Sequence, residues 1–304
     1  MELWVGITIA SAFLQNLRSV FQKHLKGQMG TTGATFVRFG FGVPFAILYL
    51  AVLHLGLGRP LPVPGTAFFV WGMVGGLAQI GATFLLVYLF SFRNFAVGTA
   101  YSRTEPAQAA IIAFLFLGET LDAKGVLALC ISMGGVMLVS VARTELTARS
   151  LLVSTFSRNA RIGLLSGLLF GLSAVAYSSA SGSLAPSLPK PDAMMQAGFT
   201  LVFVIAAQSL VMLAWLAWRQ PGELRNMGRA WKVSLATGFV GATASFGWFT
   251  AMTLQHPALV RSLAQVEMLF TFASTAFIFK ERINRLELAG CIMVVAGILL
   301  LFLK

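Results

Sequence analysis

Four glutamates in two apolar segments are the residues of this sequence best suited to chemistry. Glu105 and Glu119 are fourteen residues apart, and so are Glu267 and Glu281. A shift of 162 residues superposes the two pairs and also places Gly135 on Gly297. Burial disfavours the charged form of a carboxylate, so an acid in an apolar segment can exchange a proton. An internal repeat that carries such an acid is typical of transporters that arose by duplication.

Arginines also lie within apolar segments, at positions 18, 38, 103 and 261. A guanidinium binds carboxylate or phosphate through two parallel hydrogen bonds. Four arginines against two glutamates near the middle of a segment leave an excess of positive charge, which predicts an anionic or zwitterionic substrate. Arg18 and Arg38 have an alternative explanation, since their side chains can extend to the membrane surface. Arg103 lies deeper and is expected to face water, a carboxylate or a ligand.

Glu105 is expected near the centre of its helix, on one face with Tyr101 and Gln108. This polar stripe predicts a site that couples transport to protons or binds a substrate amine, and Glu267 is the equivalent coupling residue. The alternative is structural: each carboxylate forms a permanent ion pair with an arginine across the interface between the two halves. Glu119 and Glu281 are expected at segment ends, where they stabilise a turn.

Further polar and aromatic residues are candidates for lining a substrate cavity together with Tyr101, Arg103 and Gln108. They are Gln15, Gln79, Thr83, Tyr177 and Trp248. An aromatic ring with hydroxyl and amide groups nearby suits a small amphipathic ligand, although ordinary core packing is the alternative for each residue. The sequence contains no nucleotide-binding G-x-x-x-x-G-K-[ST], no H-E-x-x-H and no G-x-S-x-G. We therefore expect no enzyme, no cofactor and no metal site.

The composition predicts an all-α polytopic membrane protein. The chain is 57% hydrophobic and 11% charged, whereas a soluble domain carries about a quarter charged residues. An unpaired backbone cannot face lipid, so segments of about 20 apolar residues are expected to cross the bilayer as helices. Ten such segments are predicted, at 3–22, 33–55, 64–90, 95–117, 124–142, 160–181, 192–218, 230–253, 257–279 and 285–303.

The ten segments divide into two repeats, residues 1–143 and 160–304, joined by a linker at 144–159. Because five is odd, the second repeat enters the membrane from the opposite side, and the two repeats have inverted topology. This arrangement predicts a substrate site between the repeats and transport by alternating access.

The basic residues of the predicted loops determine the orientation. Fourteen lie on one side of the membrane and four on the side of the N-terminus. Cytoplasmic loops carry the excess of Lys and Arg, so both termini are predicted outside. The net charge of +12 therefore indicates no nucleic-acid partner, since the basic residues flank the membrane segments. Small-residue stretches allow close helix packing within or between chains, and a monomer is possible.

Small residues, a proline, an apolar run and then Gly-Glu follow one another in AYSRTEPAQAAIIAFLFLGET, where Ala100, Pro106, Gly118 and Glu119 carry the pattern. This segment and the five-plus-five organisation resemble the EamA-type exporters of the drug/metabolite transporter superfamily. The second repeat departs from the pattern at Met268 and Lys280. The resemblance implies a transporter of the bacterial inner membrane that exports small metabolites, with amino acids, including aromatic ones, as the leading substrates. Alternatives are a flippase for lipids or lipid-linked sugars and a membrane receptor or scaffold without transport activity.

The orientation can be tested with reporters fused to the C-terminus. If both termini are outside, an alkaline phosphatase fusion will be active, because that enzyme folds in the oxidising periplasm. A fluorescent protein that matures only in the cytoplasm will stay dark at the same position. The opposite pattern would reverse the orientation.

Overall fold

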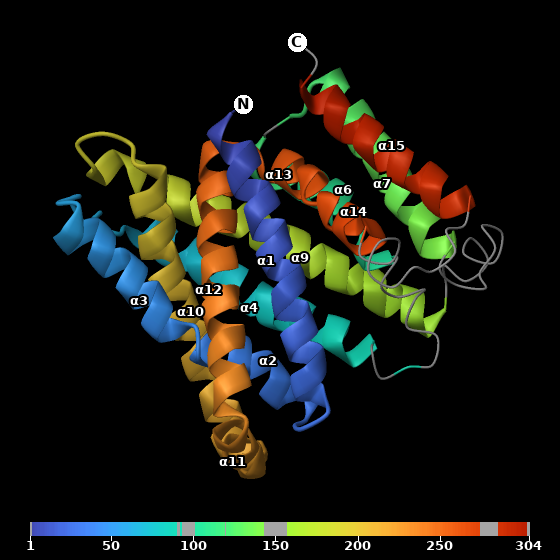
Figure 1. Ribbon diagram of the computed structural model, residues 1–304. Coiled ribbons are helices and arrows are strands. Elements are labelled where there is room, and N and C mark those ends of the chain that lie inside the picture. The colour runs from blue at the N-terminus through green and yellow to red at the C-terminus, as the bar shows by residue number, and fades with distance from the viewer. Residues whose placement is uncertain are drawn as a thin grey trace. The chain divides into compact units, whose positions relative to one another are not determined.

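The computed structural model describes residues 2–89, 92, 101–118, 120–142, 157–273 and 285–302, and the regular elements in these ranges are helices (Figure 1). Glu119, Glu281 and linker residues 144–156 lie outside the described ranges. The chain forms two compact units, each built from parts of both predicted repeats. Unit 1 comprises residues 1–80 and 173–255, and unit 2 comprises residues 81–172 and 256–304.

Unit 1 contains several helices in full, the first half of α4 (Thr66–Leu89) and the end of α9 (Arg158–Gly182). The complete helices are α1 (Leu3–Lys26), α2 (Thr31–Gly40), α3 (Val43–Ala51) with the π-helical turn η1 (Val52–Gly56), the short 3₁₀ turn η2 (Ala185–Ser187), α10 (Ala193–Arg219), α11 (Pro221–Arg229) and α12 (Trp231–Leu254). In this unit α1 packs along α12, and α10 contacts α2, α3 and α12.

Among the residues that the structure describes, unit 2 contains the remaining parts of α4 and α9 and five further helices. These are α6 (Glu105–Leu117), α7 (Ala123–Ala142), α13 (Pro257–Leu263), α14 (Val266–Ala273) and α15 (Arg285–Phe302). Helix α13 packs against α6 and α7, and α14 packs against α15.

Four stretches of the described chain are long and apolar enough to cross a membrane. They are Thr31–Gly56, Thr66–Leu89, Arg158–Ser187 and Ala193–Arg219. Each coincides with a span predicted from the sequence, so the all-helical, multi-pass organisation agrees with expectation. The other six spans stay predictions: α1, α7, α12 and α15 coincide with four of them, and 95–117 and 257–279 are described in part.

The placement of Glu105 at the centre of a continuous helix was wrong. The chain is helical at 101–102, turns at Arg103 and Thr104, and begins α6 at Glu105. Pro106 explains the break, because proline disfavours the helical conformation of the residue before it and is accepted in the first turn of a helix. The equivalent segment also breaks, at residues 264–265, so that Glu267 lies in the first turn of α14.

Helices α7 and α15 lie side by side and pack through glycines (Figure 1). A Cβ atom on Gly135 would lie 2.6 Å from the carbonyl oxygen of Gly290, and one on Gly297 would lie 2.8 Å from that of Ala128. Residue numbers rise along one helix as they fall along the other, so the two helices are antiparallel. Small residues let the backbones approach, as is common between membrane helices.

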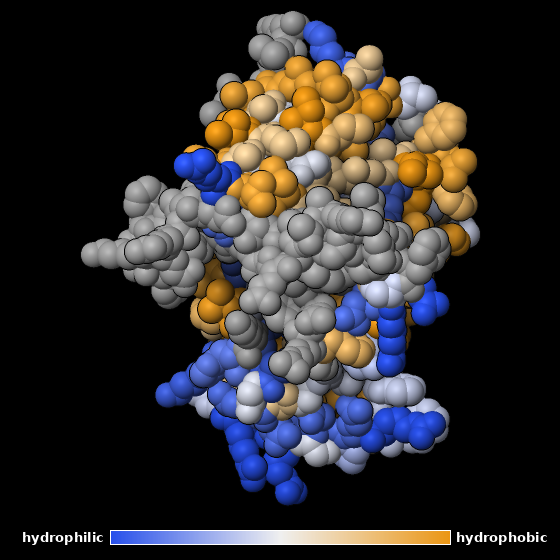
Figure 2. All heavy atoms as spheres, turned by 90° about the vertical axis from the view of Figure 1, so that its right-hand side faces the viewer, coloured by the Kyte–Doolittle hydropathy of each residue, from blue (hydrophilic) through white to orange (hydrophobic). Residues whose placement is uncertain are grey.

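The outward faces of these two helices are apolar. Val126 and Leu127 on α7 and Ile292 and Leu299 on α15 are exposed large hydrophobic side chains. Figure 2, which shows the side on which α7 and α15 are drawn in Figure 1, has a broad area of hydrophobic residues there. A continuous exposed apolar surface of this kind suits contact with lipid.

Gly135→Ala should destabilise unit 2, because the added methyl group would collide with the Gly290 backbone, which cannot move aside cheaply. We expect a loss of about 1–3 kcal/mol, typical of overpacking, measured as a lower midpoint of thermal unfolding in detergent. Gly134→Ala is the matched control, since its methyl group would meet the flexible end of Met293. Equal midpoints for the two variants would contradict the close contact.

Candidate functional site

Two ion pairs in unit 2 join residues that are far apart in the sequence. Arg103 donates from Nη2 to Glu267 Oε1 at 3.3 Å and from Nη1 to Oε2 at 3.4 Å. Arg261 Nε lies 3.0 Å from Glu105 Oε1. Each pair takes its arginine from one predicted repeat and its glutamate from the other. We call Arg103, Glu105, Arg261 and Glu267 the charge quartet.

The two helix breaks determine where the glutamates of the quartet lie. Glu105 is the first residue of α6, and Glu267 is in the first turn of α14. The N-terminus of a helix carries partial positive charge and unpaired N–H groups, which stabilise a nearby carboxylate. Each glutamate thus lies at the start of a helix and faces a guanidinium.

The two pairs differ in exposure and in length. The side chains of Arg103 and Glu267 are 35% and 11% exposed, whereas those of Arg261 and Glu105 are 8% and 18% exposed. Both contacts of Arg103 are longer than the 2.7–2.9 Å that is usual for a charge-assisted hydrogen bond. The Arg103–Glu267 pair therefore has two longer contacts and the more exposed arginine, whereas the Arg261–Glu105 pair has one shorter contact.

The arginines do not share the repeat symmetry of the glutamates. The shift of 162 residues that superposes Glu105 on Glu267 aligns Arg103 with Gln265 rather than with Arg261. The displacement of four residues is about one helical turn. In both pairs an arginine neutralises the glutamate of the other repeat, but the two arginines occupy different positions relative to the repeat.

A second polar cluster, uncharged, lies inside unit 1. The Tyr177 hydroxyl donates to Gln79 Oε1 at 3.1 Å, and Gln208 Nε2 donates to the same oxygen at 3.0 Å. Gln208 Nε2 also lies 3.0 Å from the carbonyl oxygen of Gly76, and the Tyr177 ring stacks obliquely on Phe249 with centroids 4.4 Å apart. All three polar side chains are buried. Sequence reasoning missed Gln208, although an amide within the apolar run of α10 was the available signal.

The ten predicted site residues divide between the units. Gln15, Gln79, Tyr177 and Trp248 belong to unit 1, and Thr83, Tyr101, Arg103, Glu105, Gln108 and Glu267 belong to unit 2. The expected stripe of Tyr101, Glu105 and Gln108 is interrupted by the turn at 103–104. Tyr101 instead packs on Ala160 of α9, and Gln108 donates to the Thr104 hydroxyl at 2.7 Å.

The remaining predicted site residues are placed as follows. Thr83 and Trp248 are buried, whereas Gln15 on α1 is half-buried. Arg18 and Arg38 are buried as well, and a Cβ atom on Gly241 would lie 3.3 Å from Arg18 Cδ and 3.5 Å from Arg38 Cγ. Within the described ranges, no three His, Cys, Asp or Glu side chains group closely enough to hold a metal ion.

Arg261→Gln should strongly destabilise the protein, because it leaves the Glu105 carboxylate buried beside a neutral group. Removing one partner of a buried pair costs about 3–5 kcal/mol. The double variant Arg261→Gln with Glu105→Gln should recover most of the lost thermal stability, since it removes both charges. Arg229→Gln, at an exposed arginine of α11, is the control and should unfold like the parent. A double variant no more stable than Arg261→Gln would rule out direct pairing.

The comparisons with known proteins agree with this architecture. A family model described as the EamA-like transporter family matches the chain twice, at residues 2–141 and 162–303. A solved structure described only as the crystal structure of a protein is 17% identical and superposes with a TM-score of 0.69 over 98% of this chain and 96% of the other. At that identity the likeness concerns the fold alone. Among curated proteins none matches significantly. The two matches together span nearly the whole sequence, and the chain belongs to the EamA-like transporter family, whose members are membrane transporters of small molecules.

Proposed function

We propose that this protein is a secondary transporter that exports small zwitterionic or anionic metabolites, with amino acids, including aromatic ones, as the leading candidates. Ten membrane-spanning helices form two inverted repeats, residues 1–143 and 160–304, joined by the linker 144–159. Transport proceeds by alternating access, in the bacterial inner membrane, with both termini outside. Membership of a family of transporters supports the general activity, and the charge quartet supports the substrate class.

The Arg103–Glu267 pair carries the argument for a zwitterion. Its two contacts, at 3.3 and 3.4 Å, are long, and the Arg103 side chain is 35% exposed. An amino acid offers a carboxylate to Arg103 and an ammonium to Glu267, so it can replace both halves of the pair without leaving a buried charge uncompensated. A permanent cation can pair with Glu267, but the Arg103 guanidinium then faces the cation without a carboxylate of its own. The pair therefore discriminates against cations by repulsion as well as by lost contacts.

The contact between α7 and α15 supports inverted repeats. The shift of 162 residues carries Gly135 to Gly297 and Ala128 to Gly290. The observed contact of Gly135 with Gly290 is thereby converted into that of Gly297 with Ala128, which is also observed. Exchange of the repeats thus preserves this antiparallel interface, as a two-fold axis perpendicular to both helices requires. For helices that cross a membrane, such an axis lies in the membrane plane.

We assign proton coupling to Glu105 and Glu267, and the two carboxylates become available to a proton under different conditions. Glu105 faces Arg261 at 3.0 Å in the less exposed pair, so a proton can replace this contact only when the pair opens. Glu267 faces the more exposed guanidinium and becomes available when a substrate carboxylate occupies Arg103. Glu267 is therefore the residue at which binding and coupling can meet directly.

The proposal is tested by counterflow in proteoliposomes with separate pools of labelled amino acids, nucleosides and quaternary amines. We expect uptake from the amino-acid pool. Arg103→Gln should lower that uptake about tenfold or more, because a hydrogen bond to a charged group contributes about 1.5–3 kcal/mol. Arg103→Lys should retain part of it, since the charge remains without the two-pronged geometry. Arg229→Gln on the exposed face of α11 should transport like the parent.

Thermal unfolding of the same variants separates transport from folding. Uptake lost in Arg103→Gln at an unchanged unfolding midpoint supports direct recognition. Preferential uptake of quaternary amines, or equal loss for every solute, would contradict it. Scrambling of labelled lipid in place of solute counterflow would identify a flippase.

A further inference from the structure

A pocket of about 610 Å³ lies at one end of unit 1, beside the N-terminus of α10. Its volume falls within the range of small-molecule sites. Leu3 at the start of α1 contributes to its lining, so the pocket lies at the end of the unit where the chain begins. The proposed charge quartet belongs to unit 2 and contributes no residue to this lining.

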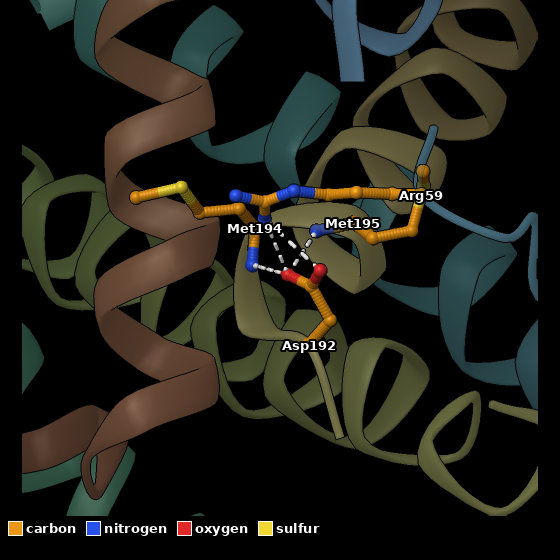
Figure 3. A network of polar contacts seen from close by, with 4 residues as sticks. All are labelled: Arg59, Asp192, Met194 and Met195. Carbon is orange, nitrogen blue, oxygen red and sulfur yellow. Dashed lines mark hydrogen bonds and ion pairs between the residues drawn. The ribbon is translucent and has the colours of Figure 1, made fainter. Parts of the chain in front are cut away.

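One wall of the pocket is built around the ion pair of Arg59 and Asp192 (Figure 3). Arg59 Nη1 donates to both carboxylate oxygens of Asp192, at 2.9 and 3.0 Å. Asp192 also caps α10, because its Oδ1 accepts from the backbone N–H groups of Met194 and Met195 at 3.1 Å each. The carboxylate is thus already occupied, and its role is to hold Arg59 in place.

The loop that carries Arg59 is ordered by its own backbone contacts. The Arg59 N–H donates to the carbonyl oxygen of Leu53 at 3.1 Å, and His54 Nδ1 lies 2.8 Å from the Arg59 carbonyl oxygen. Gly58 has φ of 64°, a conformation that glycine adopts without steric cost. The lining also includes Pro189 and Pro191, whose rings restrict the backbone. A rim ordered in advance loses little entropy when a ligand binds.

The charges and the walls of the pocket specify an amphipathic anion. Lys190 is exposed on the rim, and Arg59 has guanidinium N–H groups beyond the Nη1 that contacts Asp192. With Asp192 already engaged, the charge offered to a ligand is positive. Leu188, Met194 and Leu254 supply apolar surface next to it. A carboxylate attached to an apolar body matches both features.

We propose that this pocket is a docking site for the carboxylate of a small amphipathic metabolite, on the membrane side that holds the N-terminus. The inference rests on the proposed function in one respect, since the ligand belongs to the class of solutes that the protein transports. Lys190 attracts and pairs with the carboxylate, Arg59 supplies a second, fixed donor, and the leucines contact the apolar body.

The test uses two probes that share a body and differ in charge, N-acetyl-L-phenylalanine and its uncharged amide. Binding to the purified full-length protein in detergent is measured by isothermal titration calorimetry. The carboxylate probe should bind more tightly than the amide. Lys190→Gln should weaken binding of the carboxylate probe by up to about fivefold, the upper ratio for a solvent-exposed charge pair, and leave binding of the amide unchanged. Lys190→Arg should restore binding, and Lys232→Gln, at an exposed lysine of α12, should have no effect.

A second variant locates the binding without altering charge. Ala193 lines the pocket and is half-buried, so Ala193→Phe should fill it and abolish binding of both probes. Equal affinity for the two probes, or carboxylate binding that survives Ala193→Phe, would overturn the proposal. Phospholipid that co-purifies with the parent and is lost in Ala193→Phe would overturn it in favour of a lipid site. Counterflow that fails for every solute while Lys190-dependent binding persists would instead refute transport and leave the docking site standing.

Discussion

An ionised side chain in an apolar helix bundle costs several kcal/mol unless an opposite charge lies beside it. In unit 2, four charged side chains compensate one another in two pairs, Arg103 with Glu267 and Arg261 with Glu105. Both glutamates also lie at the start of a helix, Glu105 as the first residue of α6 and Glu267 in the first turn of α14, where the partial positive charge of the helix N-terminus favours a carboxylate. The guanidinium of the paired arginine is the principal compensating charge for each carboxylate.

How far the sequence could anticipate this arrangement depends on the kind of signal. Repetition of Glu105 at Glu267 identified the two carboxylates, and apolar runs located helices such as α4 and α10. The break before α6 was also readable in principle, since Pro106 disfavours the helical conformation of its predecessor. The break before α14 has no such marker, because Met268 occupies the proline position. Pairing of each carboxylate with an arginine of the other repeat was the structural alternative that the sequence offered, and both pairs are observed. Which arginine pairs with which glutamate was not predictable, since Arg261 meets Glu105 across a separation of 156 residues that no local pattern encodes.

The uncharged polar cluster of unit 1, formed by Gln79, Tyr177 and Gln208, is stabilised by hydrogen bonds rather than by ion pairs. Gln79 accepts two hydrogen bonds through one amide oxygen, from Tyr177 and from Gln208. Each group is polar but uncharged, so burial costs less than for an ion, while a lost partner still leaves an unsatisfied donor or acceptor. Such a cluster fixes the mutual positions of α4, α9 and α10 without a field that would attract or repel a charged solute. Gln208 was overlooked because a lone amide in an apolar run is a weak signal.

A transporter needs at least one buried interaction that can open and re-form at little cost. The two ion pairs of the charge quartet differ in the features that determine this cost. Arg261 Nε and Glu105 Oε1 lie 3.0 Å apart in the less exposed pair. Opening this pair leaves each charge alone in an apolar medium, and a buried charge that has lost its partner costs about 3–5 kcal/mol. The Arg103 side chain is partly exposed, and its two contacts with Glu267 are longer, at 3.3 and 3.4 Å. In the proposed mechanism, the less exposed pair of Arg261 and Glu105 stays closed, and a zwitterionic substrate replaces the contacts between Arg103 and Glu267 with its own two charges.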